Sequence, residues 1–195
     1  LNGRQFIQKM NTDLTASIFS TVFGSGSTNV NISPTAFLVD ICERIFISGW
    51  GGSTNNTWNG STGNTNGMAV TFDAEQNTTD GSDFYFMVLE AEATALLYGS
   101  YFGGNGIAEH VDGGTSRFND NGVIHQAACA GCGGSDDFPT TNGVVSEVNG
   151  NSCNLGVVKL DLEISAVHVE ISGGGSQSGC APFEVEFESD LVNAT

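Results

Sequence analysis

Basic residues are scarce in this sequence. Lysine and arginine together number 5, against 22 aspartates and glutamates, which gives a formal net charge of −17. Because phosphate binding needs clustered lysine and arginine, this composition argues against a nucleic-acid partner, and equally against an anionic membrane surface. A strongly acidic surface keeps a protein soluble and also attracts cations.

Long apolar runs and a targeting segment are missing as well. No stretch approaches the roughly 20 apolar residues that a membrane-spanning helix needs, which predicts no membrane insertion. The first residues do not read as a signal peptide. We therefore expect the sequence to be a mature fragment or a piece of a longer polypeptide.

Helix-favouring composition is poor, whereas glycine occurs 27 times and valine, isoleucine, phenylalanine and threonine recur in short runs. Short β-rich runs between glycine-rich turns predict an all-β protein. Two runs carry apolar residues on both faces of a strand, FYFMVL at 84–89 and RIFIS at 44–48. Strands of this kind are buried on both faces, which favours a stacked or radial arrangement of antiparallel sheets.

The apolar runs form an internal repeat. The segment IFSTVFG at 18–24 resembles LYGSYFG at 97–103, at an offset of 79 residues. The same offset aligns VDICERIFIS at 39–48 with FNDNGVIHQA at 118–127 without a gap. The segments 39–48 and 118–127 each consist of an apolar residue, an Asp or Asn, a short turn and an apolar strand.

A third copy of the repeat begins with KLD at 159–161, which aligns with KMN at 9–11 at an offset of 150. We predict about two and a half propeller-like repeats, near 6–83, 84–155 and, in part, 156–172. Residues 173–179, GGGSQSG, read as a flexible linker. The alternation in APFEVEFES at 181–189 predicts one half-buried strand.

Several of these segments resemble a known family. LLYGSYFGG (96–104), GGTSRFNDNGVIHQAACAGCGGSDDFPTT (113–141) and ISPTAFLVDICERIFISGWGG (32–52) resemble the SBBP-type β-propeller repeats of very large, type IX-secreted surface proteins of gliding bacteria. GCAPFEVEF (179–187) resembles the opening strand of an immunoglobulin-like PKD domain, which would occupy 180–195. The resemblance implies an extracellular role in adhesion, gliding-associated display or scaffolding, with no catalytic residues.

The five cysteines suggest disulfides. A zinc knuckle needs four ligands, and CAGC at 129–132 supplies two without a convincing fourth. A thioredoxin-like pair needs a βαβ context that is absent here. A disulfide framework fits a secreted protein. We favour a Cys132–Cys153 bridge, consider a Cys42–Cys129 bridge, expect CAGCGG to be a stapled loop, and expect Cys180 to pair elsewhere or stay single.

Acidic turns offer oxygen ligands for calcium. They lie at 78–83, 119–122 and 135–138, and none matches a complete EF-hand loop. Asp and Asn also populate turns for backbone reasons alone, and that interpretation is preferred. No cofactor is expected apart from structural Ca²⁺, for which the candidate residues are Asp80, Asp83, Asp120, Asp136 and Asp137.

Catalytic motifs are lacking. The sequence contains neither G-x-S-x-G nor H-E-x-x-H. His125 aligns with Phe46 of the repeat and is expected to pack, while His110 is expected in a loop as the one histidine available for exposed chemistry. We therefore predict a non-enzymatic extracellular structural or adhesion module that binds other proteins or itself, as in a surface fibre.

A second hypothesis is a carbohydrate-binding module. Residues 51–67, GGSTNNTWNGSTGNTNG, are of low complexity and read as an exposed loop. Trp58 in that loop would stack on a glycan, whereas Trp50 is expected to pack at a strand end.

Overall fold

The computed structural model describes residues 3–52, 63–111, 116–132, 137–148, 150, 154–162, 164, 167–169 and 177–180. For residue 132 and the short strands at 167–169 and 177–179, it describes the backbone alone. In these residues the regular elements are antiparallel strands and one short 3-10 helix, η2 (Ala91–Ala93). The predicted all-β class is therefore confirmed.

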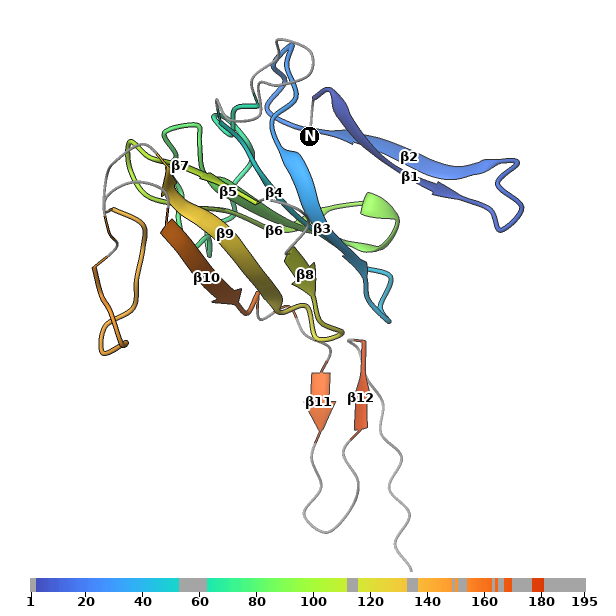
Figure 1. Cartoon of the computed structure of the whole chain (residues 1–195). Helices are drawn as coiled ribbons and strands as arrows, with labels where there is room; N and C mark the ends of the chain where they lie inside the picture. The colour runs from blue at the N-terminus through green and yellow to red at the C-terminus, as the bar shows by residue number, and fades with distance from the viewer. Residues whose placement is uncertain are drawn as a thin grey trace, which may run out of the picture.

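Two larger sheets form the body of the molecule (Figure 1). The central sheet is a meander of β3 (Ser33–Val39), β4 (Ile45–Trp50), β5 (Phe84–Leu89) and β6 (Leu96–Phe102). In the second sheet, β9 (Ile124–Cys132) lies between β10 (Asn154–Leu160) on one side and both β7 (Ala108–His110) and β8 (Ser116–Phe118) on the other. β7 pairs with the end of β9 and β8 with its start.

Two hairpins complete the described chain. β1 (Gln5–Met10) pairs with β2 (Ser17–Phe23), and this hairpin extends away from the sheets in Figure 1. β11 (Val167–Val169) pairs with β12 (Gln177–Gly179) below the second sheet. β12 falls inside the segment predicted to be a linker, so the end of that segment is a strand; the predicted strand at 181–189 lies outside the described residues.

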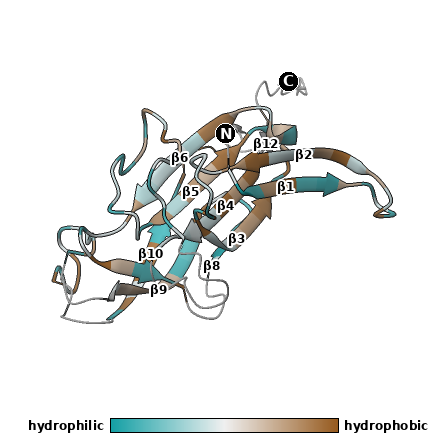
Figure 2. Cartoon of the chain, turned by 90° about the horizontal axis from the view of Figure 1, so that it is seen from above, coloured by the Kyte–Doolittle hydropathy of each residue, from teal (hydrophilic) through white to brown (hydrophobic). Residues whose placement is uncertain are grey.

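The inner strands of the central sheet are covered on both faces. Every residue of β4 and β5 is buried, as their continuous apolar pattern predicts. Phe84, Phe86 and Val88 pack in one cluster with Ile124 and other residues of the second sheet. The intervening Tyr85, Met87 and Leu89 pack in a second cluster with residues of the β1–β2 hairpin. Figure 2 shows the hydrophobic segments on β2, β3 and β4 that contribute to these layers.

Strand pairing follows the 79-residue offset residue by residue. In the hairpin, Gln5 pairs with Phe23, and in the central sheet the equivalent Phe84 pairs with Phe102. The match continues along both strands and includes the same irregularity near their ends, at Lys9/Met10 and at Val88/Leu89. The offset inferred from sequence is therefore confirmed for these strands, whereas the domain boundaries stay a prediction.

The turn after β3 recurs after β8 with the same hydrogen bonds. The Asp40 carboxylate accepts the N–H groups of Cys42 and Arg44, both at 2.9 Å. The Asn119 amide oxygen, 79 residues later, accepts the N–H groups of Asn121 and Val123 at 3.0 and 2.9 Å. An Asx side chain that binds the backbone two residues on stabilises such a turn, which explains why Asp and Asn occupy this position.

Each sheet combines parts of two successive copies. β3 and β4 belong to the first copy, and β5 and β6 to the second. In the second sheet, β8 and β9 belong to the second copy, and β10 aligns with β1 at the offset of 150. The third copy then departs from the pattern, because β11, which aligns with β2, pairs with β12.

Within the residues described above, no helix has the length and apolar character needed to cross a membrane.

Candidate functional site

Two acidic side chains are buried side by side beneath the surface. Asp83 directly precedes β5 and Glu109 lies in β7, and both residues are 0% exposed. The Glu109 N–H donates to the Ser82 carbonyl at 3.2 Å, which holds the two segments together. A β-carbon on Gly103 would overlap Asp83 Oδ1 and lie 2.8 Å from Glu109 Oε2, so the two carboxylates face the same point.

A pocket of about 200 Å³ leads from solvent to Asp83. Asp80 and Gln76 line it together with residues 103–105. We call this cavity the acidic pocket. The Asp80 carboxylate accepts the N–H groups of Ser82 and Gly106 at 2.8 and 2.6 Å, and Gln76 Oε1 accepts the Gly103 N–H at 3.0 Å. Backbone donors thus fix the oxygen atoms of the pocket wall in place.

The buried carboxylates have unused oxygen atoms. Glu109 Oε1 accepts the Gly104 N–H at 2.9 Å. Glu109 Oε2 and both oxygens of Asp83 have no hydrogen-bond partner among the described residues. Thr79 and the Asp80 N–H lie close enough to Asp83 to lower its pKa slightly, but neither reaches hydrogen-bond geometry. Buried acceptors without donors lower the stability of the folded protein, and a bound proton or cation would relieve this cost.

Burial is the main reason why both carboxyl groups resist ionisation. Removal from water raises the pKa of Asp83 to about 6, and the nearby Asp80 charge adds to the effect. Burial raises the pKa of Glu109 to about 8, with further contributions from the charges of Asp83 and Asp80. These are the two acidic groups among the described residues whose pKa is clearly raised.

In the first repeat a neutral amide makes the backbone contact that corresponds to that of Glu109, although its residue, Asn31, aligns with the neighbouring His110 at the offset of 79. Asn31, 1% exposed, accepts the Ser25 N–H at 2.9 Å, and Ser25 aligns with Gly104 at the offset of 79. The Asn31 amide group also donates to Ser25 Oγ and to the Asn64 carbonyl at 2.9 and 2.6 Å. Glu109 makes the equivalent backbone contact but, when ionised, has no hydrogen to donate.

The site makes stability depend on pH. Glu109 has an ordinary pKa of 4.5 and a pKa of about 8 in the folded protein, so the folded state holds this proton more tightly than the unfolded state. The resulting stabilisation is complete below pH 4.5 and lost by about pH 8. In chelator, urea unfolding should therefore give a free energy of unfolding that falls over this range.

The Glu109→Gln variant provides the control for this pH dependence. It carries no proton at this position, so it should lose the fall between about pH 6 and 8, leaving the contribution of Asp83 below pH 6. Parallel pH profiles for the two proteins would contradict this assignment.

The candidate calcium residues do not all lie at one site in the structure. Asp80 and Asp83 both line the acidic pocket. The backbone of Asp137 lies beside Gly104, at the edge of the same region. Asp120 is exposed in the turn between β8 and β9, and Asp136 lies outside the described residues. Calcium binding itself stays a prediction.

Glu109 was missed in the sequence, although a signal was present. In the alternating stretch of β7, its neighbours on the same face, Ile107 and Val111, are 3% and 7% exposed. An acidic residue between two core positions of a strand indicates a buried carboxyl group.

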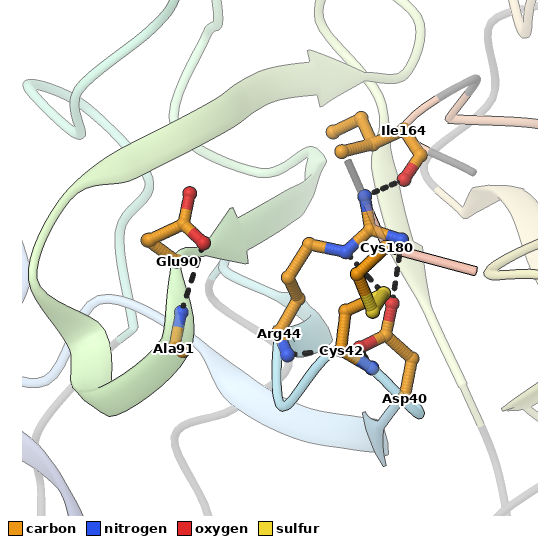
Figure 3. Close-up of a disulfide and its surroundings, with 7 residues drawn as sticks. All are labelled: Asp40, Cys42, Arg44, Glu90, Ala91, Ile164 and Cys180. Atoms are coloured by element: carbon orange, nitrogen blue, oxygen red, sulfur yellow. Dashed lines mark hydrogen bonds and ion pairs between the residues drawn. A yellow bond between two sulfur atoms is a disulfide. The ribbon is translucent and has the colours of Figure 1, made fainter. Parts of the chain in front are cut away.

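A disulfide joins Cys42 to Cys180, with their Cα atoms 5.5 Å apart (Figure 3). The Cys42–Cys129 bridge that we considered is therefore wrong, as is the expectation that Cys180 pairs elsewhere or stays single. Cys42 lies in the turn after β3, whereas Cys129 lies within β9 at the position equivalent to Trp50, the last residue of β4. Beside the bridge, Arg44 forms a salt bridge with Asp40 at 2.6 Å.

The CAGC motif also differs from its expected structure. Its four residues end strand β9, so they form part of a strand and not the loop that we predicted. The favoured Cys132–Cys153 bridge lies outside the side chains that the structure describes.

His110 is half-buried in β7 and not in a loop, with its ring 5.5 Å from that of Trp50. Trp50 ends β4 at 8% exposure, which confirms its packing role. Half-buried His125 pairs with Lys159 of β10. Trp58 lies outside the described residues, so the glycan contact stays a prediction.

Comparison with protein-family models, curated proteins and solved structures gives no match for this chain.

Proposed function

We propose that this chain is a non-enzymatic, extracellular structural module, built from β-propeller-like blades that stack face to face, in a large secreted bacterial surface protein. The observation that carries the proposal is the internal repeat, because it specifies how successive sheets cover one another. The disulfide between Cys42 and Cys180 is consistent with an oxidising, extracellular location. The module would act by binding other copies of itself through the two outer faces of the stack.

The outer face of the β1–β2 hairpin is apolar and exposed. Phe6 is 65% exposed and Val22 is 46% exposed. Their equivalents in the central sheet, Tyr85 and Tyr101, are 0% and 3% exposed because the hairpin and the segment around Met68 cover them. We call the exposed surface of Phe6, Ile18 and Val22 the N-terminal end face.

The outer face of the second sheet is its counterpart. Leu155 and Val157 in β10 are 79% and 78% exposed. Trp50 and Cys129 are equivalent at the offset of 79, and their partners on the next strand are Phe84 and Leu155. β10 therefore aligns with β5 at an offset of 71. The equivalents of these two residues are therefore Phe84 and Phe86, which are 0% exposed under the second sheet. Leu155 and Val157 form the C-terminal end face.

The two end faces are complementary within the repeat. In the stack, the face that contains Phe84 and Phe86 contacts the sheet that follows, and the face that contains Tyr85 contacts the hairpin that precedes. The C-terminal end face of one copy should accordingly pack against the N-terminal end face of the next. Such a contact joins unlike surfaces, so it continues into a fibre unless it closes into a ring.

Two variants test this contact by light scattering coupled to size exclusion. The wild type should form assemblies that grow with concentration, whereas Phe6→Asp and Val157→Asp should each be monomeric. A mixture of the two variants should form a 1:1 dimer, because each retains the face that the other has lost. The control is Phe72→Asp. Phe72 is 103% exposed but belongs to neither end face, so this variant should assemble like the wild type.

A wild type that stays monomeric at every concentration would overturn the proposal. Assembly of Phe6→Asp or Val157→Asp at the wild-type level would do the same, since it would show that other surfaces mediate the contact.

A further inference from the structure

We infer that Asp83 and Glu109 bind a divalent calcium ion at the inner end of the acidic pocket. The site does not depend on the proposed role in assembly.

The geometry leaves oxygen atoms directed at one point. Both oxygens of Asp83 and Oε2 of Glu109 are buried without a hydrogen-bond donor among the described residues. Two of these atoms face each other beside Gly103, where a side chain would displace them. Asp83 lines the pocket of about 200 Å³, so its buried carboxylate lies next to that cavity. A cation at this point would satisfy three acceptors that the protein itself leaves without partners.

The donor atoms at this end of the pocket are the hard oxygens that calcium prefers. Gln76 Oε1 and the Asp80 carboxylate line the same cavity, and each retains a lone pair beside the backbone N–H groups that it accepts. Among the described residues that line the pocket there is no histidine or cysteine, which disfavours zinc and copper. The net charge of −17 raises the local concentration of cations around the molecule.

The number of carboxylates limits the expected affinity. Among the described residues, no three acidic, histidine or cysteine side chains already converge as a metal site. The site therefore relies on two carboxylates, completed by amide and water oxygens, and Asp80 stays at the pocket wall. A dissociation constant of about 10⁻⁴–10⁻³ M, as in extracellular calcium modules, is expected.

The comparison between repeats gives independent support. In the first repeat the corresponding backbone N–H group is accepted by Asn31, which aligns one residue away, with His110, and whose amide hydrogens donate to two oxygens. The second repeat replaces this donor with the carboxylate of Glu109 and places another carboxylate, Asp83, next to it. Position 83 aligns with Arg4 in the first copy, so the first copy offers no second carboxylate. Compared with the first repeat, the second repeat therefore lacks the amide hydrogens of Asn31 and has two carboxylates at this buried point. This arrangement favours the binding of a cation.

Isothermal titration of the chelator-treated, full-length protein at pH 7.5 tests the site with CaCl₂, and with MgCl₂ as the comparison ion. The wild type should bind one Ca²⁺ at this site, and its melting temperature should rise in 10 mM CaCl₂. Asp83→Asn and Glu109→Gln should each weaken calcium binding by at least tenfold. Glu109→Gln should nevertheless melt at or above the temperature of the calcium-free wild type, because it introduces the amide that Asn31 supplies in the first repeat.

Asp120→Asn is the matched control, because it removes an exposed carboxylate from a turn outside the pocket and should leave binding unchanged. A wild type with no calcium response, or equal calcium affinity in Glu109→Gln, would overturn the inference. In that case the two carboxyl groups share a proton and bind no metal. Loss of binding in Asp120→Asn but not in Glu109→Gln would place the ion elsewhere and would equally refute the site. If Asp83→Asn fails to fold, Glu109→Gln alone decides between these outcomes.

Discussion

Replacing Phe86 with alanine should lower the free energy of unfolding by about 3–5 kcal/mol, the cost of removing a fully buried phenylalanine from a packed core. Phe86 is 0% exposed in the middle of the central sheet, where it packs with residues of the second sheet. The surrounding strands are held by neighbours on both sides, so the cavity can collapse only in part. Urea unfolding of the wild type and the variant, followed by tryptophan fluorescence, measures the loss.

The repeat supplies matched controls for this substitution. Ile7 and Val157 occupy the same position as Phe86 in the first and third copies, and they are 9% and 78% exposed. Ile7→Ala should cost about 2–3 kcal/mol, and Val157→Ala should change stability by less than about 0.5 kcal/mol. Equal losses at the three positions would contradict the stacked arrangement, because they would mean that all three side chains are equally buried.

Removal of the Cys42–Cys180 bridge should lower the free energy of unfolding by about 2–5 kcal/mol. The bridge closes a segment with a sequence separation of 138 residues, and long loops lie toward the upper end of this range in the chain-entropy description. The measurement is urea unfolding of Cys42→Ser, Cys180→Ser and the double variant under non-reducing conditions. Mass spectrometry of the unreduced wild-type digest should detect the two cysteines in one linked peptide.

The two single variants also act as controls for each other. Since either substitution removes the same bridge, each should cost about as much as the double variant. Losses that add in the double variant would show that the two cysteines stabilise the protein separately and are not bonded together.

Much of the architecture could be predicted from the order of apolar residues. The apolar runs at 84–89 and 44–48 indicated burial on both faces, and every position of the two runs is buried except Arg44, which is half-buried. The 79-residue offset aligned Asp40 with Asn119, and each of the two side chains accepts the backbone N–H two residues on in the same kind of turn. The apolar runs are local features of the sequence. The turn occurs in two copies, so one copy supports the interpretation of the other.

Contacts between distant segments could not be predicted in the same way. The partner of Cys42 depends on where the chain returns after β10, and no repeat informs that part because β11 pairs with β12. The link between Asp83 and Glu109 likewise depends on a loop beside β6 that brings β7 next to β5. Sequence reasoning identified Asp83 by its acidic turn but had no means of placing Glu109 against it.

The Cys42–Cys180 bridge also determines how the chain would respond to stretching. A pulling force that enters through the segment before Cys42 and leaves through the segment after Cys180 passes along the covalent bond and bypasses the 138-residue stretch between them. At about 3.3–3.6 Å for each extended residue, that stretch represents roughly 450–500 Å of length that cannot be pulled out. Both larger sheets, apart from β3, would remain shielded from tension until the bond is reduced. In a protein displayed outside the cell, the redox state of one bond would thus set how far the chain extends under flow or traction.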